Sequence, residues 1–108
     1  MTRSTASLSA TAEGLRVEGV LDFETVPGLA PRLAGFLGGS PGIAADLSGV
    51  THANSAALAL MVDWTRQARA AGCEIRFLHV PAQLHTIAEV TGVDEILCMN
   101  SALRLCPG

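Results

Sequence analysis

The sequence predicts a single α/β domain with a small mixed β-sheet and helices mainly on one face. Strand-like runs alternate with helix-like runs along its 108 residues, and apolar residues make up 49% of the chain. No linker or internal repeat interrupts the pattern. Such alternation favours layered α/β folds with right-handed crossovers. We therefore expect one domain over residues 1–108, with its core at about 7–97 and a tail at 98–108.

Hydrophobic periodicity and turn residues predict the individual elements. Alternation with a period of two indicates strands, helical spacing of apolar residues indicates helices, and Gly and Pro mark the boundaries. Glu13 and Gly14 suit a hairpin turn, and Pro27 and Pro31 suit the first turns of a helix better than its interior. The expected elements are strands 7–12 and 15–21, a helical segment 22–37, a loop 38–42, strand 43–47, helix 55–71, strand 74–80, helix 81–91 and a further helical turn at 93–97.

Charge and cysteine content exclude several classes of protein. Seven arginines, no lysine and ten carboxylates give a formal charge of -3. An acidic chain without a basic cluster is not expected to bind nucleic acid or anionic headgroups.

The longest apolar run, 56–62, is far shorter than the roughly 20 residues of a membrane helix. The start of the chain has no apolar region typical of a secretory signal. The odd set of Cys73, Cys98 and Cys106 fits reduced thiols. We expect a cytoplasmic protein without direct membrane insertion.

The most informative segment runs from Asp46 to Leu60. A strand is predicted to end near Leu47, where the chain turns, and Asn54 is a good N-cap for the following helix. Successive helical residues lie about 100° apart, so one arc of this helix packs on the sheet and the opposite arc is exposed. The residues on the exposed arc are Ser55, Ala56, Ala59, Asp63, Arg66, Gln67 and Ala70, with Leu60 and Trp64 near one border.

The exposed arc has the chemistry of a docking surface. Small side chains at Ala56 and Ala59 let another backbone approach closely, and Leu60 or Trp64 would supply an apolar anchor. The Ser55 hydroxyl lies at a helix N-terminus, where backbone N–H groups and the helix dipole favour a phosphate. The alternative interpretation is that Ser55 only helps to cap the helix.

This segment resembles STAS domains, the fold of anti-sigma factor antagonists and related modules. The resemblance spans about residues 7–97 and includes Gly19-Val-Leu-Asp22, Asp46-Leu-Ser-Gly-Val50 and Asn54-Ser-Ala-Ala-Leu58. Within the family, the chain is most similar to the MlaB-type subunits of Mla phospholipid-transport ABC systems. The blocks that carry this similarity are 55–60, 63–72, 75–77, 81–84 and 92–97.

The resemblance implies a non-enzymatic subunit, peripheral to the inner membrane, that binds the MlaF-like ATPase in complex with the permease. Systems of this type maintain the lipid asymmetry of the outer membrane. The residues expected to bind the partner are His52, Asn54, Ser55, Ala56, Ala59, Leu60 and Asp63.

Ser55 also matches the position phosphorylated in anti-sigma antagonists, which makes it the candidate phosphoacceptor. The alternative function is therefore an antagonist switched by phosphorylation of Ser55. Asn54, Ala56 and Ala57 depart from the Asp-Ser-Ser-Gly pattern of those antagonists, which weakens the case for a kinase switch.

Other chemistry is not supported by the spacing of reactive residues. Asp46, His52 and Ser55 suggest a hydrolase triad, but the sequence has no Gly-x-Ser-x-Gly elbow. His79, His85 and the cysteines lack metal-ligand spacing. The run 38–42 lacks the Gly-Lys-Ser/Thr ending of a phosphate loop. We expect no catalytic residue, metal or cofactor. A third hypothesis, a small ligand such as a lipid between sheet and helices, has no evident pocket in the sequence.

Overall fold

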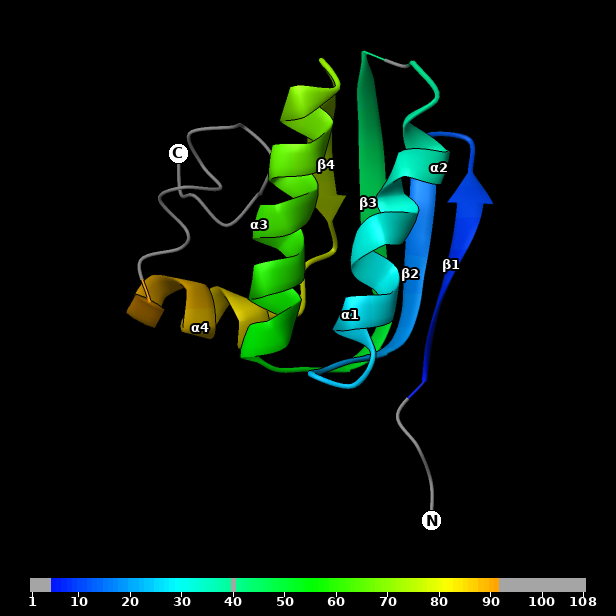
Figure 1. The fold of residues 1–108 in the computed structure, drawn as a ribbon. Coiled ribbons are helices and arrows are strands. Elements are labelled where there is room, and N and C mark those ends of the chain that lie inside the picture. The colour runs from blue at the N-terminus through cyan, green and yellow to red at the C-terminus, as the bar shows by residue number, and fades with distance from the viewer. Residues whose placement is uncertain (1–4, 40, 92–108) are drawn as a thin grey trace.

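The computed structural model describes residues 5–39 and 41–91, and within them four strands form one mixed sheet (Figure 1). β1 (Ala6–Thr11) pairs antiparallel with β2 (Gly14–Leu21). β2 pairs parallel with β3 (Gly42–Ala53), which pairs parallel with β4 (Glu74–Leu78). The helices α1, α2 and α3 cover one face of the sheet. The predicted fold class is confirmed.

The predicted helical segment 22–37 is divided into three short pieces. These are α1 (Val26–Leu29), the 3-10 helix η1 (Ala30–Leu33) and α2 (Ala34–Leu37). Proline has no backbone N–H, so Pro31 cannot complete an α-helical bond to residue 27, and the chain tightens into η1.

Two longer helices follow, α3 (Ser55–Ala70) and α4 (Ala82–Thr91), close to the predicted bounds. The helical turn expected at 93–97 and the tail lie outside the described residues.

β3 is longer than predicted, and the turn expected after Leu47 does not exist. Ser48 and Gly49 read as turn residues, yet the strand continues to Ala53. Shifts of register between Arg16 and Glu18, and between Gly19 and Val20, let β2 stay paired with this extension. The sheet therefore carries the chain directly to the start of α3.

The core lies between the sheet and the helices that cover it. The sheet contributes alternate apolar residues, and the helices contribute the side chains that face them. The largest fully buried side chains are Trp64, Phe77, Leu15, Leu21, Leu33, Leu47, Leu60, Met61, Ile75, Leu84 and Val17. Burial of these side chains is the main force that holds α3 and the α1–α2 segment on the sheet.

Replacing Gly19 with Ala should destabilise the domain. Gly19 has a φ of +99°, and an added Cβ would overlap the carbonyl oxygen of Thr5. We expect the free energy of unfolding to fall by about 1–3 kcal/mol. Gly35→Ala is the matched control, because nothing lies within 4 Å of its added Cβ. It should raise stability by about 0.4–1 kcal/mol. Urea unfolding of both variants measures the two changes, and equal effects would contradict this account.

Candidate docking surface at the start of helix α3

α3 begins at a side-chain cap, as predicted. Asn54 has extended backbone angles, and its Oδ1 accepts a hydrogen bond from the backbone N–H of Ala56 at 2.8 Å. The N–H of Ala57 donates to the Asn54 carbonyl oxygen at 2.9 Å. Asn54 therefore accepts hydrogen bonds from two backbone N–H groups of the first turn of the helix.

Because Asn54 caps the helix, the Ser55 hydroxyl is not needed as the capping group. Ser55 is exposed, and no hydrogen bond of its side chain is found among residues 5–39 and 41–91. The interpretation that Ser55 caps the helix is therefore wrong. A hydroxyl in this position is available to a partner or to a modifying enzyme.

The structure exposes three of the seven residues predicted to bind a partner. His52, Ser55 and Ala59 are exposed, and Asn54 and Asp63 are half-buried. The Asp63 Oδ2 accepts a hydrogen bond from Gln67 Nε2 at 2.7 Å, so this carboxylate is engaged within its own helix.

The predicted exposure of Ala56 is wrong, and Leu60, which was expected at the border of the exposed arc, is buried as well. Their exposed fractions are 3% and 2%, and that of Trp64 is 1%. The reason is a second neighbour of α3, since the α1–η1 segment packs along this side of the helix. Ala30 marks the contact, because its carbonyl oxygen accepts hydrogen bonds from Trp64 Nε1 at 3.1 Å and from Gln67 Nε2 at 2.8 Å. Neither Leu60 nor Trp64 is an apolar anchor for a partner.

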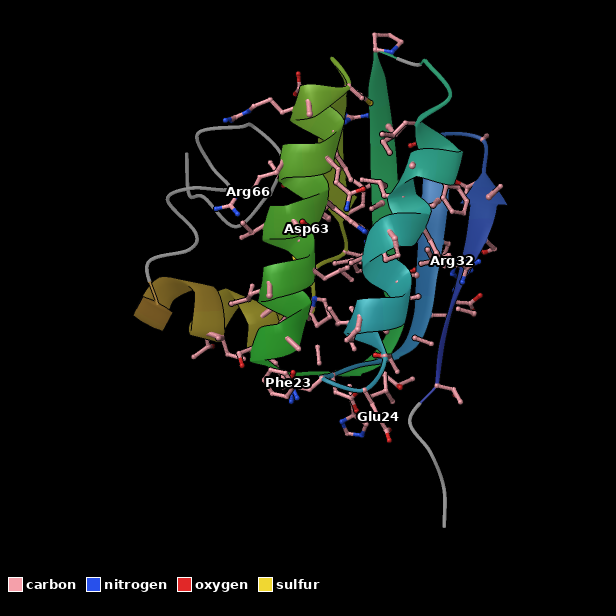
Figure 2. All side chains as sticks on the ribbon, in the orientation of Figure 1. Phe23, Glu24, Arg32, Asp63 and Arg66 are labelled. Atoms are coloured by element: carbon pink, nitrogen blue, oxygen red, sulfur yellow. The ribbon has the colours of Figure 1, made fainter. Side chains whose placement is uncertain are left out.

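Phe23 is the exposed apolar residue that the sequence interpretation missed. It is 72% exposed and lies in the loop between β2 and α1. Figure 2 shows it at the N-terminal end of α3. Placing residues 22–37 in one helix concealed this loop. In the sequence, this loop is indicated by Asp22 and Thr25. Both are residues of the kind that cap helix N-termini, and both precede Pro27.

We call the exposed side chains of Phe23, His52, Ser55 and Ala59 the tip surface. The segments that carry Phe23 and Ser55 leave the sheet side by side, because Leu21 pairs with Ala53 at the ends of β2 and β3. The N–H of Asn54 also donates to the Leu21 carbonyl oxygen at 3.2 Å. Of the four side chains, the aromatic ring of Phe23 is of the type that is enriched at contacts between proteins.

The residues of the suggested hydrolase triad are not assembled. Asp46 and His52 belong to the same extended strand and lie about 20 Å apart, at 3.3 Å per residue. Asp46 Oδ1 instead accepts a hydrogen bond from the Ser48 N–H at 2.9 Å, and this bond keeps the pKa of Asp46 below its usual range. A catalytic triad requires hydrogen bonds between its neighbouring members, and this distance excludes one between Asp46 and His52.

Other reactive groups also lack the setting for chemistry. Burial raises the pKa of the Cys73 thiol, which makes it a poor nucleophile. Within the described residues, no three His, Cys, Asp or Glu side chains lie together in a way that could hold a metal ion. His85 lies on α4, and Cys98 and Cys106 lie outside the described part of the chain.

Fully buried side chains lie between the sheet and the helices, and the largest of them are Trp64 and Phe77. A depression of about 350 Å³ does occur at the C-terminal end of α3, opposite to the tip surface. Its lining residues are Pro41, Thr65, Arg69, Gly72, Cys73, Glu74 and Ile75. None of the helices in the described ranges has both the length and the apolar character needed to cross a bilayer.

A mixed sheet covered on one face by helices, with a capped helix that follows the central strand, is the architecture expected of a STAS domain. The chain belongs to the STAS domain family, since a family model described as "Mlab, STAS domain" matches residues 4–100. STAS domains are in general regulatory or accessory domains rather than enzymes. A comparison with curated proteins gave no match.

Asn54 and Ser55 should differ in their effects on stability. Asn54→Ala removes the cap and should lower the free energy of unfolding by about 1 kcal/mol. Ser55→Ala should change it by less than about 0.5 kcal/mol, because this hydroxyl stabilises nothing in the described structure. Denaturant unfolding of the two variants measures the difference. A larger loss of unfolding free energy for Ser55→Ala than for Asn54→Ala would contradict the assignment of Asn54 as the cap.

Proposed function

We propose that this STAS domain is an accessory subunit that docks through its tip surface onto the ATPase of an Mla-type phospholipid ABC transporter. The observation that carries the proposal is the exposed Ser55 hydroxyl on a helix already capped by Asn54. A side chain that makes no hydrogen bond among the described residues, at the family's Ser/Thr position, is suited to a partner. The description of the matching family model supports the same assignment.

In this role the domain lies at the cytoplasmic side of the inner membrane, held there by the ATPase and the permease. The transporter complex would maintain the lipid asymmetry of the outer membrane. Docking regulates the ATPase only if the domain binds one conformational state of the ATPase more tightly than another. No cofactor or bond-making step is required of the domain.

The approach of a partner along α3 is limited to one strip. Ala56 and Leu60 are buried, and the α1–η1 segment packs against α3. Ala59, one helical turn after Ser55, is exposed and has only a methyl group. The strip from Ser55 to Ala59 therefore allows close backbone contact.

Ser55→Arg tests this proposal. Arginine at the exposed tip is compatible with the fold, but it would introduce bulk and an unpaired charge into the contact. We expect a loss of about 2 kcal/mol or more, roughly 30-fold in Kd for the purified ATPase. Ser9→Arg is the matched control, since Ser9 is an exposed serine on the edge strand β1. The affinity of this variant for the ATPase should be unchanged. Titration calorimetry measures both, and equal binding by the Ser55 variant would remove Ser55 from the interface.

A second candidate function is an anti-sigma factor antagonist switched by phosphorylation of Ser55. The exposed hydroxyl at a helix N-terminus favours it, because the helix dipole stabilises added negative charge. It predicts that a cognate kinase and ATP add one phosphoryl group, read by intact mass, and that Ser55→Ala prevents the addition. Neighbouring genes separate the two candidates: an ABC ATPase and permease in one case, a sigma factor and its kinase in the other.

A further inference from the structure

β1 is an edge strand whose outer side meets no other strand of the described sheet. The strands lie in the order β1-β2-β3-β4, so β1 and β4 are the edges. The N–H of Val20 on β2 donates to the carbonyl oxygen of Thr5 at 2.9 Å, so these two residues form a hydrogen-bonded pair. Because such pairs alternate with non-hydrogen-bonded pairs along an antiparallel ladder, Ala6, Leu8 and Ala10 direct their backbone N–H and C=O groups away from β2.

β1 lacks the features that usually keep an edge strand from pairing with another chain. Those features are charged side chains, proline, bulges and a very short strand. β1 has six residues without a charge or a proline, and its pairing with β2 has no shift of register. β4 differs, because Glu74 and Arg76 place charges along it and the left-handed φ of 56° at His79 ends it. Of the two described edges, β1 is the one open to a further strand.

The sequence of β1 indicates that this further strand is β1 of a second copy. Residues 6–10 read Ala-Ser-Leu-Ser-Ala, which is the same in both directions. A two-fold axis beside Leu8 therefore sets leucine opposite leucine, serine opposite serine and alanine opposite alanine. In this antiparallel register, the outward backbone groups of Ala6, Leu8 and Ala10 meet matching groups of the other copy.

The side chains of β1 suit this pairing on both faces of the sheet. Leu8 is half-buried and packs against the core, so the leucine of a second copy would cover its remaining exposed surface. Ser7 and Ser9 are exposed on the opposite face, where hydroxyl groups of facing strands can form hydrogen bonds. Residues 6–10 carry no charge, so no like charges oppose each other across the axis. Because each copy uses the same strand, the contact closes at two copies.

We infer that the domain forms a two-fold symmetric dimer in solution, in which β1 pairs antiparallel with β1 of a second copy and joins the two sheets into one. The contact is a single strand pair and therefore small, so we expect a reversible dimer with a Kd in the micromolar range. The tip surface shares no residue with β1, so this inference is independent of the proposed function.

Charge pairs at the two serines test the register. Residue 7 of one copy faces residue 9 of the other, so Ser7→Lys with Ser9→Glu places opposite charges across the axis and should tighten the dimer. Ser7→Lys with Ser9→Lys places like charges there and should raise the Kd about tenfold. The matched control is Gln83→Lys with Thr86→Lys, which adds the same charge at exposed positions of α4, on the other side of α3 from β1 (Figure 1). It should leave the Kd unchanged.

Ala10→Pro tests the backbone hydrogen bonds directly. The Ala10 N–H points away from β2, so proline removes no bond within the copy, and edge strands tolerate proline. By symmetry the substitution removes two hydrogen bonds from the dimer and should raise the Kd about tenfold. The thermal midpoint of dilute samples should stay close to that of the unchanged chain.

Sedimentation velocity over a range of concentrations measures the Kd of each variant. A chain that stays monomeric at about 1 mM, where even a weak specific contact is populated, would overturn the dimer. A dimer that the β1 variants leave unchanged would overturn it too, because such a dimer uses another surface. If the two serine variants change the Kd equally, the register about Leu8 is wrong and the inference fails.

Discussion

The parallel pairing of β2 with β3 determines where the candidate functional side chains lie. The two strands remain paired to their last residues, Leu21 and Ala53. Because both run in the same direction, both chain exits lie at one edge of the sheet. One exit becomes the loop that carries Phe23, and the other becomes the start of α3. In open α/β sheets, the edge at the carboxyl ends of parallel strands is the usual place for recognition, and the candidate site of this domain lies at that edge.

Local sequence patterns were sufficient for most of the fold because each element has its own signal. The alternation of Leu15 and Val17 predicted a half-buried strand, and Asn54 predicted the start of α3. The errors arose where a local signal competes with long-range pairing. Ser48 and Gly49 favour a turn when considered alone, but the neighbouring strand keeps them extended through shifts of register. The prolines divided the segment 22–37 more completely than their positions suggested.

The exposed surface at the start of α3 was predicted less well than the fold, for two physical reasons. A helical wheel separates an inner face from an outer face, but it cannot show that a helix has two neighbours at an angle to each other. α3 packs on the sheet and also on the α1–η1 segment, so Ala56 and Leu60 are buried against this chain and unavailable to another. Ser55 and Ala59 remain exposed. Phe23 was missed because its exposure depends on a hydrogen-bonded loop, a feature without hydrophobic periodicity.

Two adjacent residues at the start of α3 have different roles, so one of them can be substituted without loss of stability. The Asn54 side chain caps the first turn of the helix, whereas the Ser55 side chain makes no hydrogen bond among the described residues. The side chain at position 55 can therefore be exchanged while the scaffold stays intact. For a protein engineer, position 55 is a natural place to vary the surface at the start of α3 without loss of folding efficiency.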